Sequence, residues 1–178
     1  MSHRFFVLSG CSGGGKSTLV SAMSEAGYAT VPEPGRRVLL TGGPRPWEDL
    51  AGFLHACIAL ARADHARAAE MPGPVIFDRC LVDALSGLDA LGKPAPDPGL
   101  RYASPVFLAP PWRDLFAPDP ERRHGFAAAV AEYDRLLQAF PAAGYAVEIV
   151  PRAPVAARVA WIAARVGPPG TRAGKVER

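Results

Sequence analysis

The sequence has few cysteines and no long apolar run, and each shortage argues against a class of protein. Its three cysteines, Cys11, Cys57 and Cys80, are odd in number and have neither metal-ligand nor disulfide-framework spacing. We therefore expect reduced thiols in a cytoplasmic protein. No apolar run reaches the length of a membrane-spanning helix, so we expect no membrane partner.

Net positive charge is also small in the body of the chain. The 178 residues carry a formal charge of +3, of which +2 lies after Gly167. A nearly neutral body has no electrostatic attraction for nucleic acid, so we expect no nucleic-acid partner. The length suits one domain, over residues 1–167. Residues 168–178 show no apolar periodicity and are expected to form a disordered basic tail.

Lysine is scarce as well, with three lysines against seventeen arginines. One of the three, Lys16, closes the segment G-C-S-G-G-G-K-S at residues 10–17. This segment fits the phosphate-binding pattern G-x-x-x-x-G-K-[ST]. An apolar run at 4–9 precedes it and a helical pattern follows from 17, which is the strand–loop–helix context that the pattern requires. The alternative is an ordinary flexible glycine turn.

The residue types in this loop suit a nucleoside triphosphate. Glycines let the backbone curl with its N–H groups pointing inward, and these groups and the helix N-terminus attract phosphate oxygens. Lys16 is expected to bridge the β- and γ-phosphates, and the Ser17 hydroxyl to bind Mg²⁺. The expected nucleotide-binding residues here are Gly10, Cys11, Ser12, Gly13, Gly14, Gly15, Lys16, Ser17 and Thr18.

The rest of the chain alternates between strands and helices. We expect strands at 4–9, 28–32, 75–77, 105–109 and 145–150, and helices at 17 to about 27, 35–41 (one turn), 47–71, 81–91, 120–143 and 154–166. In the 120–143 helix, the inward face is expected to carry Phe126, Val130, Tyr133, Leu137 and Phe140, with Asp119 as the cap. Five alternations predict an α/β protein with a parallel sheet and helices on both faces.

Asp78 and Arg79 end the third expected strand. Asp78 is expected to hold Mg²⁺ through water. Hydrolysing ATPases usually carry a second acid at the next position to activate water. Arg79 stands there instead, and we expect it to stabilise the charge on the transferring group. The alternative is that Asp78 caps the following helix and Arg79 pairs with a surface acid.

Glu33 follows the second strand, at the sheet edge where ligands of open α/β sheets bind. There it can accept a proton from an attacking hydroxyl. The alternative is an exposed loop glutamate. We also expect Phe53, His55, Arg62, Asp83 and Trp112 as candidates for an acceptor pocket.

Arginines cluster in the Pro-rich segment at 111–123. Arg113, Arg122 and Arg123 are expected to neutralise the phosphates and exclude water, although Arg122 and Arg123 can also be solvated residues at a helix start. The loop around Pro151 and Arg152 is expected to contact the base. No [NT]-K-x-D motif is present, which argues against a Ras-like GTPase.

Five motifs together resemble a known family: G-C-S-G-G-G-K-S-T, V-P-E-P-G-R-R-V, V-I-F-D-R-C-L-V-D, V-F-L-A-P-P-W and D-P-E-R-R. They resemble the small bacterial AAA-domain ATPases, kinase-like P-loop proteins similar to ribosylnicotinamide kinase domains and, more distantly, to deoxynucleoside kinases. The resemblance covers residues 4 to about 166. It implies a three-layer P-loop NTPase fold with five parallel strands in the order 2-3-1-4-5.

The resemblance also implies roles for residues. Glu33-Pro34 matches the catalytic base of deoxynucleoside kinases, and Asp78-Arg79-Cys80 matches their acid-Arg-Ser, with cysteine replacing serine. Their arginine-bearing lid matches residues 113–123. We therefore expect a Mg²⁺-dependent phosphotransferase that uses ATP, or GTP, on a small-molecule hydroxyl, with a nucleoside-like acceptor among the candidates. The open alternative is a nucleotide-binding switch that hydrolyses slowly and binds a protein or a lipid.

Overall fold

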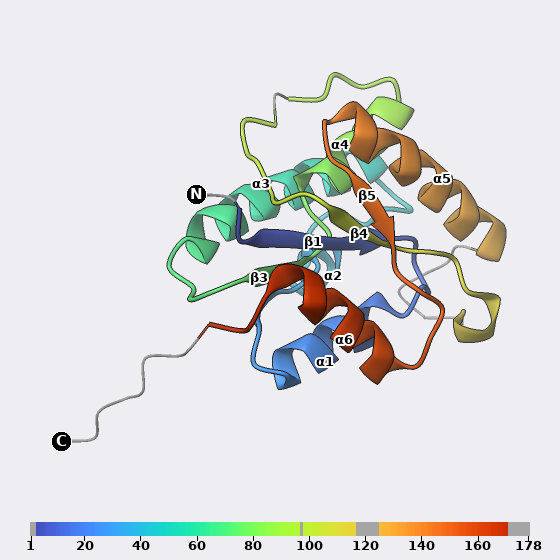
Figure 1. The fold of residues 1–178 in the computed structure, drawn as a ribbon. Coiled ribbons are helices and arrows are strands. Elements are labelled where there is room, and N and C mark those ends of the chain that lie inside the picture. Colours follow the sequence, from blue (N-terminus) through green and yellow to red (C-terminus); the bar gives the residue numbers. More distant parts are fainter. Residues whose placement is uncertain (1–2, 97, 117–124, 171–178) are drawn as a thin grey trace.

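A five-stranded parallel sheet forms the centre of the computed structural model, which describes residues 3–96, 98–116 and 125–170 (Figure 1). The strand order is β2-β3-β1-β4-β5, which confirms the expected 2-3-1-4-5. The strands are β1 (Phe5–Gly10), β2 (Ala29–Val31), β3 (Val75–Asp78), β4 (Val106–Ala109) and β5 (Val147–Ile149).

Helices cover both faces of the sheet, as the alternating pattern predicts. They are α1 (Lys16–Glu25), α2 (Pro34–Leu40), α3 (Leu50–Ala68), α4 (Leu81–Ala90), α5 (Phe126–Ala142) and α6 (Val155–Val166), with a short 3₁₀ turn η1 (Arg113–Leu115). Two apolar cores result, one under α3, α4 and α5 and the other under α1 and α6. Figure 1 shows α1 and α6 together below the sheet and α3, α4 and α5 on its other side.

Strand β1 belongs to both cores because successive side chains of a strand point to opposite faces. Phe5 and Val7 face the α3–α5 side, and Phe6 and Leu8 face the α1–α6 side. All six residues of β1 are buried, which explains why residues 5–8 are continuously apolar instead of alternating.

Several helix ends differ from the expected ones. Helix α3 begins at Leu50, three residues later than expected, because the Asp49 side chain caps it by accepting the Gly52 N–H at 2.8 Å. The same helix ends at Ala68 instead of residue 71. Helix α5 begins at Phe126, preceded by Gly125, and the expected cap Asp119 lies outside the described residues.

The inward face of α5 is also different from the expected one. Its buried residues are Ala129, Leu136 and Phe140, whereas Leu137 is 39% exposed. The prediction is confirmed for Phe140 and is wrong for Leu137, because it followed the larger apolar side chains, while part of the true buried face is made of alanine. This rotation places Glu132, which is half-buried, on the side that faces the P-loop.

The chain after α6 packs for a few more residues. Gly73 has a φ of +64°, and a Cβ built on it would lie 2.4 Å from Gly170. A Cβ built on Gly27 would likewise lie 3.6 Å from the Pro169 ring. Residues 168–170 therefore lie on the domain, and 171–178 are outside the described part. No helix within the described residues has both the length and the apolar character to cross a membrane.

Candidate functional site

The loop between β1 and α1 has the curled backbone of a phosphate-binding loop. Gly13 and Gly15 have φ of +78° and +73°, a region that favours glycine. Gly10, with φ of +127°, ends β1 so close to β4 that an added Cβ would lie 2.2 Å from the Ala109 carbonyl oxygen. Helix α1 then begins, with Leu19 N–H donating to the Gly15 carbonyl, so the free amides of its first turn lie at the loop.

Lys16 is buried in this loop, at 4% exposure, and its Nζ donates to the Cys11 carbonyl at 2.6 Å. Burial lowers the pKa of Lys16, and Arg79 lowers it further, while Asp78, Glu33 and Glu132 act in the opposite direction. The Lys16 ammonium group thus binds a carbonyl of its own loop. A phosphate would offer it a better partner than a backbone carbonyl, because charge-assisted hydrogen bonds are the stronger ones.

Asp78 is the last residue of β3 and is 4% exposed. Burial raises its pKa to about 6, against the opposing effect of Lys16. Helix α4 is capped by Cys80 and by Asp83, whose carboxylate accepts the Cys80 N–H at 2.9 Å. Asp78 is therefore not the helix cap, and the alternative role considered for it from the sequence is wrong.

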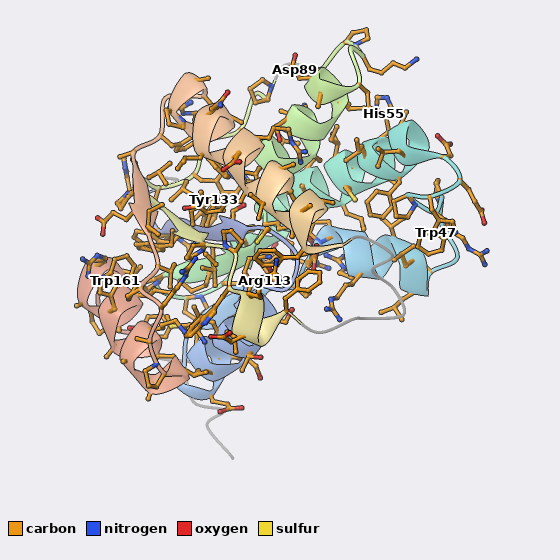
Figure 2. The ribbon with its side chains drawn as sticks, turned by 90° about the vertical axis from the view of Figure 1, so that its right-hand side faces the viewer. Trp47, His55, Asp89, Arg113, Tyr133 and Trp161 are labelled. Carbon is orange, nitrogen blue, oxygen red and sulfur yellow. The ribbon has the colours of Figure 1, made fainter. Side chains whose placement is uncertain are left out.

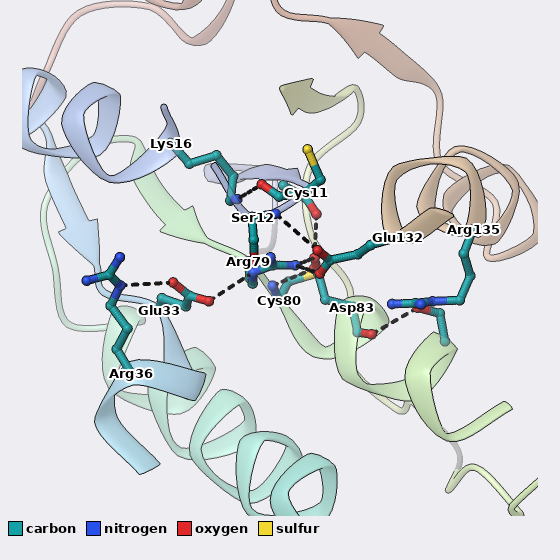
Figure 3. Close-up of polar contacts among 12 residues, drawn as sticks. Cys11, Ser12, Lys16, Glu33, Arg36, Arg79, Cys80, Asp83, Glu132 and Arg135 are labelled. Carbon is teal, nitrogen blue, oxygen red and sulfur yellow. Dashed lines mark hydrogen bonds and ion pairs between the residues drawn. The ribbon is translucent and has the colours of Figure 1, made fainter. Parts of the chain in front are cut away.

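Arg79 is the centre of an ion-pair network formed by three elements around it (Figure 3). Its guanidinium lies 3.1 Å from Glu33, 3.2 Å from Asp83 and 2.9 Å from Glu132. Its backbone has a φ of +66°, the one non-glycine positive φ among the described residues. Burial alone would lower the pKa of Arg79, but the acids, led by Glu132, raise it well above its usual value. Arg79 is thus paired in the interior, not with a surface acid.

Glu132 of α5 is a site residue that sequence reasoning missed. Its Oε2 accepts the Ser12 N–H of the P-loop at 3.0 Å, and its Oε1 pairs with Arg79. Burial would raise the pKa of Glu132, but Arg79, Lys16 and the Ser12 N–H lower it to about 2. The available signal was its place three residues after Ala129 and four before Leu136, on the face that α5 buries.

Asp83 holds the other end of the network. Its carboxylate accepts from the Ser9 hydroxyl, the Cys80 N–H and Arg79. Because Ser9 lies in β1 and Asp83 in α4, these bonds fix α4 against the strand that leads into the P-loop.

A cavity of about 360 Å³ opens beside this network, bounded by α2, α3, α4 and α5. Ser12, Glu33 and Arg79 line the end nearest the P-loop, and Phe53 and Leu54 of α3 line an apolar wall. The cavity therefore joins the P-loop to a space large enough for a small molecule.

Of the five residues expected in an acceptor pocket, Phe53 and Asp83 line the cavity. His55, Arg62 and Trp112 are not among its lining residues, and His55 is exposed on the outside of α3 (Figure 2).

Comparison with known proteins identifies the family of the chain. The family model described as "AAA domain" matches residues 5–158. The chain belongs to the AAA-domain family. No curated protein matches it in sequence.

Two kinds of solved structure share the fold of this AAA-domain protein. A NadR protein in complex with NR has a TM-score of 0.75 at 15% identity, with 97% of this chain and 54% of that chain covered. This chain thus spans about half of that protein. A deoxyadenosine kinase from M. mycoides with bound dATP has a TM-score of 0.64 at 15% identity, with 92% and 98% covered. The same kinase with bound products has a TM-score of 0.57 at 14% identity, with 90% of this chain and 97% of that chain covered.

The AAA-domain site offers Mg²⁺ a partial donor set. Asp78 Oδ1 is buried without a hydrogen-bond partner in the described part of the chain, and Ser17 is exposed in the first turn of α1. The described residues contain no cluster of three or more His, Cys, Asp or Glu that could hold a metal. Mg²⁺ is usually held by one or two carboxylates, waters and substrate phosphates, so these residues fit Mg²⁺ that arrives with a nucleotide.

The arginines expected at the phosphates and, for Arg152, at the base have other contacts or lie outside the described part of the AAA-domain structure. The Arg113 guanidinium stacks on the Phe126 ring at 4.5 Å, and Arg152 donates to the Pro111 carbonyl at 2.6 Å. Arg122 and Arg123 lie outside the described residues. The expectations for these four residues stay predictions.

Arg158 of α6 is a second residue that sequence reasoning missed. It is 4% exposed, and its Nη1 lies 3.2 Å from the point where a Cβ on Gly15 would be. The Arg158 guanidinium carbon lies over the Trp112 ring, 5.7 Å from the ring centroid. The Arg158 Nε has no hydrogen-bond partner among the described residues. Burial lowers the pKa of Arg158. A buried cation with no acidic partner in the described part of the chain, next to a P-loop glycine, suits an anionic ligand.

Proposed function

We propose that this protein is a Mg²⁺-dependent phosphotransferase that moves the γ-phosphoryl group of ATP to a hydroxyl group of a small molecule. The observation that carries the proposal is the position of Glu33 and Arg79. Both line the cavity at the end where Ser12 of the P-loop also lines it. A hydroxyl in this cavity would therefore lie between a carboxylate base and the phosphate-binding loop.

In this proposal the P-loop binds the donor. Lys16 releases the Cys11 carbonyl and bridges the β- and γ-phosphates, while the amides of residues 13–18 hold phosphate oxygens. Ser17 and Asp78 would hold Mg²⁺, which supplies charge neutralisation at the β- and γ-phosphates when bound. Arg158, beside Gly15, gives a further positive charge to the nucleotide.

Glu33 is the proposed base. It takes the proton of the acceptor hydroxyl as the oxygen forms a bond to the γ-phosphorus, and the bond from that phosphorus to the β–γ bridging oxygen breaks, so that ADP leaves. Arg79, 3.1 Å from Glu33, stabilises negative charge on the transferring group. Arg113, Arg122 and Arg123 remain candidates for the same task, and Arg152 for contact with the base of ATP or GTP.

The test is acceptor-dependent ADP release by the purified protein with Mg²⁺ and ATP or GTP, over nucleosides, sugars, aminoglycosides and hydroxy acids. We expect one acceptor class to stimulate release, and Lys16→Ala to abolish nucleotide binding. Glu33→Gln should lower the stimulated rate by roughly 10²–10⁴-fold, the usual contribution of general base catalysis, with nucleotide affinity kept. His55→Ala, on the exposed side of α3, is the matched control and should behave as the native protein.

Two outcomes would contradict the proposal. Tight nucleotide binding with slow turnover that no acceptor stimulates would favour the switch with a protein or lipid partner. A stimulated rate that survives Glu33→Gln would remove Glu33 from the role of base.

A further inference from the structure

Arg135 of α5 lines the cavity at the end away from Glu33. Figure 3 shows Glu33 and Arg36 on one side of the network, Arg135 on the other, and Arg79, Asp83 and Glu132 between them. Arg135 is half-buried. Within residues 3–96, 98–116 and 125–170, its guanidinium makes one hydrogen bond, a long one of 3.4 Å from Nε to the Ser86 hydroxyl oxygen.

The other arginines of the cavity wall are paired with acids. Arg36 lies 3.4 Å from Glu33, and Arg79 has three carboxylate partners. Arg135 has no acidic partner among the described residues, since Glu132, one helical turn away, is bound to Arg79 and Ser12. The cavity thus holds one cation whose counterion is not supplied by the described protein.

The rest of the wall is apolar or already bonded. Phe53 and Leu54 of α3 form one apolar side, with Gly87 packed against Leu54, and the small residue Ala128 lines the wall on α5. The sequence contains no asparagine and a single glutamine, Gln138, which does not line the cavity. Side-chain amides, which read the donors and acceptors of a nucleobase edge, are therefore absent from the described wall of the cavity. Its polar groups are charged, apart from Ser12.

We propose that the acceptor taken by this cavity is an anion: a small alcohol with an apolar body and a carboxylate or phosphate group bound by Arg135. This inference rests on the proposed function and names its substrate class. The hydroxyl of the acceptor lies toward Glu33, its body lies along Phe53 and Leu54, and its anionic group meets the guanidinium. An arginine fork matches carboxylate and phosphate geometry alike.

The competing explanation is structural. Arg135 could simply tie α5 to α4 through Ser86, whose hydroxyl donates to the Asp83 carbonyl at 2.9 Å and leaves a lone pair for Arg135. That role requires no ligand. It predicts that Arg135→Gln changes stability but leaves the preference between ligands as it was.

The experiment compares matched alcohols by calorimetry. The carboxylate pair is 4-(hydroxymethyl)benzoate against 4-(hydroxymethyl)benzamide, and the phosphate pair is 4-(hydroxymethyl)phenyl phosphate against 4-methoxybenzyl alcohol. We expect the anionic member of at least one pair to bind about tenfold tighter or more, as charge-assisted hydrogen bonds allow. The pair with the larger ratio identifies the anionic group.

Variants assign the preference to Arg135. Arg135→Gln should reduce the ratio to about twofold or less, and Arg135→Lys, which keeps the charge, should keep part of it. Arg67→Gln is the control, because Arg67 lies on α3 outside the cavity. If Arg135→Gln does not fold, the test uses the ratio of anionic to neutral binding in the native protein and the reduction of that ratio in Arg135→Lys. Equal binding within both pairs, no binding by any of the four compounds, or a ratio unchanged in Arg135→Gln would overturn the inference.

ADP release with the same four compounds separates the two proposals. An anion preference that depends on Arg135, without ADP release from any acceptor, would contradict the phosphotransferase and leave the anion-binding cavity standing. ADP release stimulated equally by neutral and anionic members would support the phosphotransferase and contradict the anionic acceptor.

Discussion

At the scale of single residues, the most informative feature is the set of buried charged side chains near the P-loop. Lys16, Asp78, Asp83 and Arg158 are all buried, and burial without partners is costly. Lys16 and Asp83 have hydrogen-bond partners within the protein, whereas Asp78 Oδ1 and Arg158 Nε have none in the described chain. One unpartnered atom is anionic and the other cationic, which is the complement of a phosphate chain that carries Mg²⁺.

Arg158→Met should therefore separate stability from binding. Replacing a buried, uncompensated cation by an apolar side chain is often neutral or stabilising. We expect the nucleotide-free variant to unfold at the native temperature or above it. We also expect its ADP affinity to be about tenfold weaker, as loss of one charged hydrogen-bonding group allows. Thermal melts with and without Mg-ADP measure both quantities.

The matched control is Arg165→Met on the same helix, where the arginine is partly exposed and paired with Glu148. It should leave nucleotide affinity unchanged. If Arg158→Met instead lowers stability by several kcal/mol and keeps full affinity, Arg158 is a structural residue that packs against Trp112.

At the scale of elements, the strands and the P-loop could be predicted from the sequence because their signals are local. A strand buried on both faces is a continuous apolar run, as at β1 and β3. The ends of α3 and the buried face of α5 could not be predicted as well. Asp49 caps α3, so that the helix begins at Leu50 instead of residue 47, and alanines on α5 give no strong apolar periodicity.

The junction of β1 and the P-loop predicts a large difference between two glycine substitutions. Gly10 and Gly92 both have positive φ, but an added Cβ would lie 2.2 Å from Ala109 at Gly10 and meets nothing within 4 Å at Gly92. Gly92→Ala should cost about 1 kcal/mol in free energy of unfolding, from backbone strain. Gly10→Ala should cost more than about 3 kcal/mol, because β1 and β4 must also move apart.

Chemical denaturation measures both costs. Equal losses for the two variants would mean that β1 and β4 are not packed at Gly10 as described. Nucleotide binding gives a second measure, because Gly10→Ala also changes the start of the phosphate loop while Gly92→Ala lies at the end of α4.

At the scale of the whole molecule, the site is a network that joins distant parts of the chain. Glu33, Arg79 and Glu132 come from three segments, 46 residues apart in the first pair, and meet at the P-loop. Glu33 and Arg79 were predicted because each follows a strand at the ligand-binding edge of the sheet. Glu132 was not, since its contact with Ser12 spans 120 residues and depends on how α5 packs. The local sequence offers only the spacing of Glu132 from the buried Ala129 and Leu136, and this spacing does not reveal the partner across the fold.

This network predicts how stability changes in acid. The folded-state pKa of Glu132 is about 2 against an ordinary value of 4.5, so its contribution is complete above pH 4.5 and is lost as the pH falls toward 2. The shift corresponds to about 3 kcal/mol. The raised pKa of Asp78, about 6 against 3.8, has the opposite sign, but its effect lies above pH 3.8 and barely overlaps with that window.

Glu132→Gln should thus be less stable than the native protein at pH 7 by a few kcal/mol, with a difference that shrinks steadily between pH 4.5 and 2. Urea denaturation across this range measures the difference. Glu148→Gln is the control, because Glu148 is partly exposed and its pair with Arg165 is screened by solvent. It should change stability by about 1 kcal/mol or less. A Glu132→Gln difference that stays constant with pH would mean that the native carboxylate is not held by Arg79 and the Ser12 amide, and the arrangement of α5 over the P-loop would then have to be abandoned.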